Sequence, residues 1–264
     1  MKKDVVAGLG EIGIPILKIL SRNQTVVGYD INEKLMNKSK FIKFENNQTS
    51  FLHIAIPFNK KFRTNIISLY KKFQPECIVI HSTISPGTTI QLQKKLNIPI
   101  IYSATRGVHK QMVKDLKRYT KFYSISPNAP KKEWATKLFS KKMKIAGIKT
   151  KQMSKPETLE LAKIVCDTSY LGWLVNYAQI SNLIAQKFNV NYDEMWTFSD
   201  EIHTLLGNRP KMFPGFIGGH CVIPNLQLID NQTLNMIKEI NNLYDKKFKT
   251  ARSIAKKYNQ KLNR

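Results

Sequence analysis

Three glycines near the amino terminus have the spacing needed to hold a pyrophosphate. Gly8, Gly10 and Gly13 follow a short apolar strand expected at residues 4–7 and open an apolar helix expected at 14–20. In such a unit the first glycine permits the turn, the second lets a pyrophosphate approach the backbone, and the third lets helix and strand pack closely. The positive end of the helix dipole then faces the phosphates. The pattern predicts a dinucleotide site; the alternative is a glycine-rich turn in a domain without nucleotide.

An acid at the end of the next expected strand, 25–29, supports the dinucleotide site. Asp30 lies 22 residues after Gly8. A carboxylate there accepts hydrogen bonds from the adenosine ribose and repels a 2′-phosphate, so we expect NAD as the cofactor rather than NADP. The candidate cofactor-binding residues are Gly8, Gly10, Glu11, Ile12, Gly13, Asp30, Pro57, Ser82 and Thr83.

A cysteine beside adjacent glycines is the second feature that could do chemistry. Residues 211–225 read KMFPGFIGGHCVIPN, and the glycines before Cys221 would expose its thiol and let a ligand approach the backbone. An exposed thiol on such a loop can act as a nucleophile. The alternative is a buried structural cysteine.

Alternating strands and helices must position these groups. Further strands are expected at 51–57, 77–81, 98–102, 122–126 and 144–147, and further helices at 62–73, 89–96 and 131–142. Such alternation predicts an α/β fold with a Rossmann-type, doubly wound parallel sheet, which we assign to residues 1–152.

A smaller all-α domain is expected over residues 153–264. A long apolar helix should connect the domains from Pro156 to about Phe188, because Pro156 and Glu157 are typical of a helix start. Helices at 193–206 and 232–262 should follow, the last one basic, with one face packed on the body. The long helix is too apolar for a solvated face, so it crosses between domains or packs against a second subunit.

Composition limits the classes of function. The chain has 264 residues and a net charge of +25, which favours anionic partners, while 42% hydrophobic residues exclude disorder as the main state. The three cysteines form no CxxC pair, so we expect no metal site, and a reducing, cytoplasmic location. The uncharged run 168–186 contains Asn176, Gln179 and Asn182, which favours a buried helix over a membrane span.

Several segments resemble one enzyme family. PGFIGGHCVIPN resembles the PGxGGHCIPxD signature of the UDP-N-acetylmannosamine branch of the nucleotide-sugar 6-dehydrogenases, relatives of UDP-glucose dehydrogenase. HSTISPGTT, residues 81–89, resembles the family's STVxPGTT turn, and residues 160–163 resemble the start of its catalytic-domain helix. The resemblance covers most of residues 1–230. Only 39 residues follow Asn225, so we expect the family's C-terminal UDP-binding domain to be lacking.

The resemblance implies a mechanism as well as a fold. It implies NAD-linked oxidation of a sugar alcohol, with Cys221 as the nucleophile that forms a thiohemiacetal and then a thioester. It implies that Lys163 stabilises an alkoxide or oxyanion, a task suited to an ammonium group. Thr83 would lie near the nicotinamide and a catalytic water. For Lys163 the alternative is a solvated helix lysine.

Three positions depart from the family. Asp167 replaces an asparagine, Asn225 replaces an aspartate, and Thr105 replaces the glutamate that assists thioester hydrolysis. A threonine hydroxyl can hold a water but cannot take its proton at neutral pH. A single oxidation, or the reverse reduction, is therefore an alternative to the four-electron reaction. If Asp167 and Asn225 flank Lys163, the exchange keeps one carboxylate and one amide beside it. The candidate catalytic residues are Cys221, Lys163, Asp167, Asn225 and Thr83.

Basic and glycine-rich loops supply the candidate substrate site, with a solvated basic surface as the alternative. Its residues are Thr105, Arg106, His109, Arg209, Lys211, Gly218, Gly219 and His220. We expect an anionic sugar or phosphorylated alcohol as substrate, a homodimer formed through the long helix, and neither membrane nor nucleic-acid binding. The rival hypothesis is a catalytically weak dinucleotide-binding sensor or partner subunit, with a separate chain supplying the missing domain.

Overall fold

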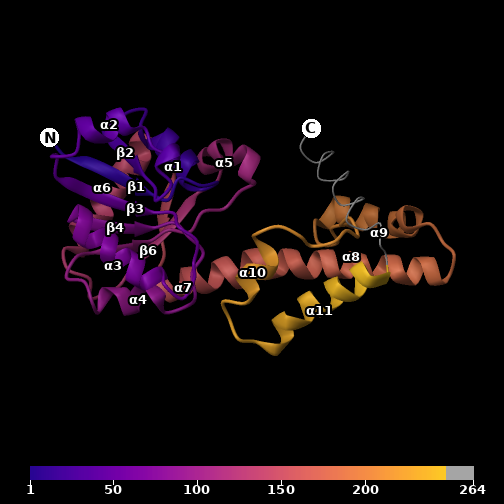
Figure 1. Ribbon diagram of the computed structural model, residues 1–264. Coiled ribbons are helices and arrows are strands. Elements are labelled where there is room, and N and C mark those ends of the chain that lie inside the picture. The colour runs from indigo at the N-terminus through magenta and orange to yellow at the C-terminus, as the bar shows by residue number, and fades with distance from the viewer. Residues whose placement is uncertain (248–264) are drawn as a thin grey trace. The chain divides into compact units, whose positions relative to one another are not determined.

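The computed structural model describes residues 1–247 and divides the chain into two compact units, Met1–Lys163 and Ile164–Arg264 (Figure 1). The first unit holds the sheet and the second is helical. The expected α/β class, followed by a helical region, is confirmed.

Seven strands form the sheet, in the order β2-β1-β3-β4-β5-β6-β7. They are β1 Lys3–Ala7, β2 Val26–Tyr29, β3 Thr49–Ile54, β4 Cys77–Ile80, β5 Ile100–Tyr102, β6 Lys121–Ile125 and β7 Thr150–Gln152. Neighbouring strands are parallel except β5 and β6. The predicted parallel sheet is confirmed for the other pairs, and the antiparallel β5–β6 pair is a departure from it. β6 starts beside the carboxyl end of β5, where the Lys121 Nζ reaches the Ser103 and Ala104 carbonyls, so β6 must run back along β5.

The strand expected at residues 144–147 was also wrong. Helix α6, Lys132–Ile145, continues through this segment because Met143 still faces the core. Gly147 then adopts a left-handed conformation (φ 78°), which is typical of a helix end, and β7 forms three residues later.

Helices cover both faces of the sheet, which explains why the central strands are buried throughout and read as apolar runs. One face packs against α1 Gly13–Leu20, α5 Met112–Arg118 and α6. The other face packs against α2 Lys38–Lys43, α3 Phe62–Phe73 and α4 Thr88–Gln93. Two of these helices, α2 and α5, had no counterpart among the elements expected from the sequence.

The expected helix from Pro156 to Phe188 is present but is not uniform. It consists of α7 Pro156–Leu161, a π-helical stretch Ala162–Ser169, and α8 Tyr170–Lys187. Within the second unit, α8 packs against α9 Tyr192–Leu206, α10 Val222–Leu226 and α11 Gln232–Lys247. The basic helix expected at 232–262 begins as predicted, and its residues 248–262 lie outside the described part of the chain.

The glycine turn between β1 and α1 is packed so closely that two of its glycines tolerate no side chain. A Cβ on Gly13 would lie 1.6 Å from the Gly8 carbonyl oxygen, and a Cβ on Gly8 would lie 2.7 Å from the Ala55 oxygen. A Cβ on Gly10 would meet no atom of the described residues within 4 Å. Gly8 and Gly13 are therefore required by the fold, whereas Gly10 leaves open space.

This difference predicts opposite effects on stability. Gly13→Ala should lower the melting temperature by several degrees or more, because overpacking costs roughly 1–3 kcal/mol and each kcal/mol is worth about 2–4 °C in a chain of this size. Gly10→Ala should leave the melting temperature nearly unchanged. Thermal unfolding followed by circular dichroism tests both variants, and equal melting temperatures would contradict the packing described.

Candidate active site

The carboxyl ends of β1, β3 and β4 bring several predicted cofactor residues together. Gly8 lies against the backbone of Ala55, and the Ser82 hydroxyl donates to the Ile56 carbonyl over 2.6 Å. Pro57, which follows Ile56, is exposed. β1 has β2 on one side and β3 on the other, so the strand order reverses here, and ligands of open α/β sheets bind in the crevice at such a switch point.

Asp30 holds the glycine turn in place. Its Oδ2 accepts the Leu9 N–H over 2.7 Å, and its Oδ1 accepts the Asn32 N–H over 2.8 Å. A carboxylate offers about four acceptor positions, so two remain for ribose hydroxyls. The residue therefore combines a structural task with the binding task predicted for it.

The glycine turn is also linked to the basic loop that follows β5. The Glu11 carboxylate and the His109 Nδ1 lie 2.7 Å apart, and both side chains are partly exposed. One residue predicted for the cofactor and one predicted for the substrate are thus brought into contact. The half-buried Arg106 donates to the Thr120 carbonyl over 2.8 Å, with its guanidinium 5.0 Å from the Phe122 ring centre. These contacts with Thr120 and Phe122 therefore fix much of the position of the Arg106 side chain.

Sequence reasoning missed Lys121, the first residue of β6. Its Nζ lies 3.0 Å from the Ser103 carbonyl oxygen, 3.5 Å from that of Ala104 and 3.4 Å from the Thr105 hydroxyl. Burial, with the charges of Arg106 and Lys163, lowers the pKa of Lys121 to about 7. The only signal in the sequence was a lysine at the head of an apolar strand.

A pair of buried histidines continues this polar row across the sheet. The His81 Nδ1 lies 3.2 Å from the Ser103 carbonyl, and its Nε2 lies 3.0 Å from the His53 Nδ1. Because a carbonyl only accepts, the Nδ1 of His81 carries the proton. Desolvation lowers the pKa of His81 well below its usual value, so the ring is neutral and accepts from His53. On the far side, the His53 Nε2 faces the Asp4 carboxylate at 3.8 Å, and Lys142 contacts that carboxylate at 2.8 Å.

A buried carboxylate fixes the turn that resembles the family's STVxPGTT segment. Glu160, on α7, accepts the Gly87 N–H over 2.6 Å, the Thr89 N–H over 3.0 Å and the Thr89 hydroxyl over 2.6 Å. Desolvation raises the pKa of Glu160, although these hydrogen bonds oppose the effect. Lys163 follows Glu160 by one helical turn, and Lys163 and Thr83 are both half-buried. The hydrogen bonds of Glu160 therefore hold the backbone that carries Lys163 against the turn that carries Thr83.

In the second unit, buried amides hold the glycine-rich loop. Asn241 accepts the Ile217 N–H over 2.8 Å and donates to the Ile217 carbonyl over 3.1 Å. Gln179 donates to the Gly215 carbonyl over 2.7 Å and to Asn241 over 3.0 Å. Asn176 in turn donates to Gln179 over 2.8 Å. The backbone before the catalytic candidate is therefore fixed from inside the helical unit.

The loop then presents its last residues outward. Gly218, Gly219 and His220 are exposed, as is Cys221, which immediately precedes α10. The Asn225 N–H closes the first turn of α10 on the Cys221 carbonyl over 3.4 Å. Asn225 is half-buried.

Two basic candidates have local partners. Lys211 forms a 2.7 Å ion pair with Asp193, and the exposed Arg209 donates to the Asn208 side chain over 2.8 Å. The exposed Asp167 lies on the π-helical stretch. That Asp167 and Asn225 flank Lys163 stays a prediction.

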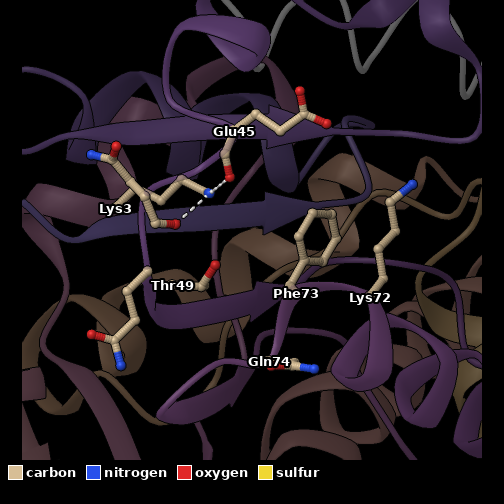
Figure 2. Close-up of a pocket in the computed structure, with 8 residues that line it drawn as sticks. Lys3, Glu45, Thr49, Lys72, Phe73 and Gln74 are labelled. Carbon is tan, nitrogen blue, oxygen red and sulfur yellow. Dashed lines mark hydrogen bonds between the residues drawn. The ribbon is translucent and has the colours of Figure 1, made fainter.

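A separate hollow of about 230 Å³ opens at the other end of the strands (Figure 2). Lys3 and Thr49, the first residues of β1 and β3, line it together with Lys72 and Phe73. The Lys3 ammonium donates to the Phe44, Glu45 and Asn47 carbonyls over 2.6–2.8 Å. Because this hollow lies at the amino ends of the strands, it is distinct from the predicted cofactor edge.

Across residues 1–247, no three His, Cys, Asp or Glu side chains gather in a way that would hold a metal ion. In the same part of the chain, no helix combines the length and apolar character needed to cross a bilayer.

Comparison with known proteins identifies relatives by structure alone. No family model and no curated protein matches the chain. The UDP-D-ManNAc dehydrogenase from Pyrococcus horikoshii aligns over 92% of this chain and 69% of its own, with a TM-score of 0.73 and 19% identity. The Staphylococcus aureus UDP-N-acetyl-mannosamine dehydrogenase aligns over 92% and 68%, with a TM-score of 0.68 and 17% identity.

A smaller enzyme also matches. The 3-hydroxyisobutyrate dehydrogenase from Mycobacterium tuberculosis aligns over 93% of this chain and 94% of its own, with a TM-score of 0.68 and 13% identity. The chain therefore shares its fold with solved UDP-sugar dehydrogenases and with a solved 3-hydroxyisobutyrate dehydrogenase.

The Glu160 contacts predict a stability effect with a matched control on the same helix. Glu160→Ala should lower the melting temperature by several degrees, because each buried donor left without a partner costs roughly 1–3 kcal/mol. Glu157→Ala should leave it equal or slightly higher, since Glu157 contributes a like charge near Glu160. Thermal unfolding of both variants measures the difference; a Glu160→Ala protein as stable as the Glu157→Ala protein would contradict this role.

Proposed function

We propose that the chain is an NAD-dependent dehydrogenase that oxidises an alcohol group of an anionic, sugar-type substrate. The observation that carries the proposal is the glycine turn at the switch point of the sheet. Neighbouring atoms leave no room for a side chain at Gly8 or Gly13, whereas Gly10 faces open space. Asp30 lies beside the turn. This is the arrangement that a dinucleotide pyrophosphate and ribose require. The fold shared with solved dehydrogenases supports the same conclusion.

The proposed roles follow from the chemistry of the side chains. Bound NAD would supply the hydride acceptor. Cys221 would attack an aldehyde through its exposed thiol, and Lys163 would stabilise the negative charge that develops on the reacting oxygen. The basic residues Arg106 and His109 would attract the anionic part of the substrate. Because Thr105 replaces the family's glutamate, we include a single oxidation, or the reverse reduction, in the proposal.

A homodimer is part of the proposal. α8 exposes apolar side chains along one face at Tyr177, Ile180 and Ile184, and the exposed Phe188 follows directly after the helix. A continuous apolar stripe of this kind is typical of a protein–protein interface. Its occupant would be the same stripe of a second copy, related by two-fold symmetry.

Cofactor binding gives the first test. The wild-type protein should bind NADH and discriminate against NADPH at least tenfold, because Asp30 repels a 2′-phosphate. Gly10→Ala should weaken NADH binding at least tenfold, since the added methyl group occupies the space through which the pyrophosphate approaches. Titration calorimetry measures both affinities. Equal affinity of the wild-type and Gly10→Ala proteins would mean that the glycine turn does not hold a pyrophosphate.

Turnover gives the second test. Nucleotide sugars, phosphorylated alcohols and small hydroxy acids should be screened for NADH production by the wild-type protein. With an active substrate, Cys221→Ala should lose the second oxidation, or all turnover if the thiol is needed throughout. Cys166→Ala, which removes another exposed thiol, should retain activity. Unchanged turnover by Cys221→Ala would rule out covalent catalysis.

The rival hypothesis, a catalytically weak sensor or partner subunit, predicts a different outcome. Such a protein would bind NADH with the affinity pattern described above but would form no NADH with any compound of the panel. NAD and substrate would then also fail to protect Cys221 from a thiol-selective label.

A further inference from the structure

We propose that Lys121 is a positioning residue that makes the Thr105 hydroxyl a proton acceptor for the reacting alcohol or water. The role rests on the proposed dehydrogenase function. In the family that the chain resembles, a glutamate stands at the position of Thr105. A threonine alone cannot take a proton at neutral pH, so the pair of Lys121 and Thr105 would replace that carboxylate.

The contacts of Lys121 fit a neutral amine. Its Nζ has three neighbours: the carbonyls of Ser103 and Ala104, which only accept, and the hydroxyl of Thr105, which can also donate. An ammonium would donate to all three oxygens, whereas a neutral amine would donate to the two carbonyls and accept the hydroxyl proton of Thr105 on its lone pair. The distance of 3.4 Å to Thr105 is long, and catalytic hydrogen bonds commonly shorten when substrate binds.

The surroundings of Lys121 favour the neutral amine. The residue is 6% exposed, and the side chains that α1, α5 and α6 place around the small cavity beside it are apolar. The charged or titratable groups near it are Arg106, Lys163 and the neutral His81. None of these is a carboxylate. The acid of the neighbouring helix, Asp115, accepts the Val108 N–H over 2.8 Å. Burial and two nearby cations lower the pKa of Lys121 to about 7.

The proton transfer balances without a further reagent. The substrate O–H bond breaks and its proton passes to the Thr105 Oγ, while the hydroxyl proton of Thr105 passes to the lone pair of the Lys121 Nζ. The oxygen of the substrate keeps the electron pair, which forms the carbonyl as the carbon gives up its hydride; the NAD of the proposed function would accept that hydride. Lys121 becomes an ammonium and returns its proton through Thr105 after the product departs. In the proposal Thr105, which follows the carboxyl end of β5, is the member of the pair that meets the substrate, because ligands of open α/β sheets bind at that end of the strands.

The first experiment measures the protonation of Lys121 directly. Full-length protein labelled with ¹³C at the lysine Cε is titrated by NMR between pH 6 and 10, and the Lys121 signal is assigned by its absence in Lys121→Arg. We expect this signal to titrate with a midpoint near 7, whereas the signal of the exposed Lys114, assigned through Lys114→Arg, should titrate near 10. A Lys121 midpoint above 10 would overturn the proposal.

The second experiment uses the pH dependence of kcat/KM with the substrate found above. In the wild type, kcat/KM should fall tenfold per pH unit below about 7. Lys121→Arg places a permanent cation at this position, which cannot accept a proton. Lys121→Arg and Thr105→Val should both lose at least 100-fold at pH 8 and lose the inflection near 7. Thr105→Ser should restore the inflection, and Lys114→Arg should match the wild type.

The outcomes separate this inference from the proposed function. A wild-type protein that binds and reduces no NAD would show that the proposed function is wrong, and this role with it. Intact NAD reduction with the wild-type inflection kept in Lys121→Arg or Thr105→Val would overturn the inference alone. Because Thr105→Val leaves the lysine in place, a folding defect of Lys121→Arg cannot hide the result.

Discussion

The absence of a side chain at Gly13 is the constraint on which the rest of the candidate site depends. It lets α1 approach the end of β1 until the Gly13 Cα lies against the Gly8 carbonyl, and it thereby sets the position of the turn between them. Asp30 can reach the Leu9 N–H only because that turn lies close to the end of β2. Glu11, at the outer part of the turn, then meets His109 on the loop after β5. A single close contact thus places groups from three separate segments along one edge of the sheet.

In the helical unit, hydrogen bonds rather than close packing hold the candidate loop in one conformation. The loop before Cys221 has little regular structure of its own, yet the amides of Gln179 and Asn241 bind its backbone at Gly215 and Ile217. In a buried environment an unmade hydrogen bond is costly, so such a network specifies one loop conformation. The exposed residues that follow can therefore carry reactive groups while the segment before them stays fixed.

Much of the first unit could be predicted from the sequence, because its signals are local. The glycine spacing, the apolar runs of the parallel strands and the helix Phe62–Phe73 all depend on neighbouring residues. The direction of β6 could not be predicted, since it depends on where Lys121 finds acceptors in a segment 16 to 18 residues earlier. Asn176 and Gln179 were visible as polar residues in an uncharged run, but the loop that Gln179 binds lies more than thirty residues away.

The π-helical stretch Ala162–Ser169 has a geometric consequence for the long helix. A π-helix turns through a smaller angle per residue than an α-helix, so the residues on its two sides fall out of phase. Leu159 and Glu160, before this stretch, are buried in the first unit. Asn176 and Gln179, after it, are buried in the second unit. Each half of the helix can therefore bury its own set of residues within its own unit, whatever the spacing between the two sets.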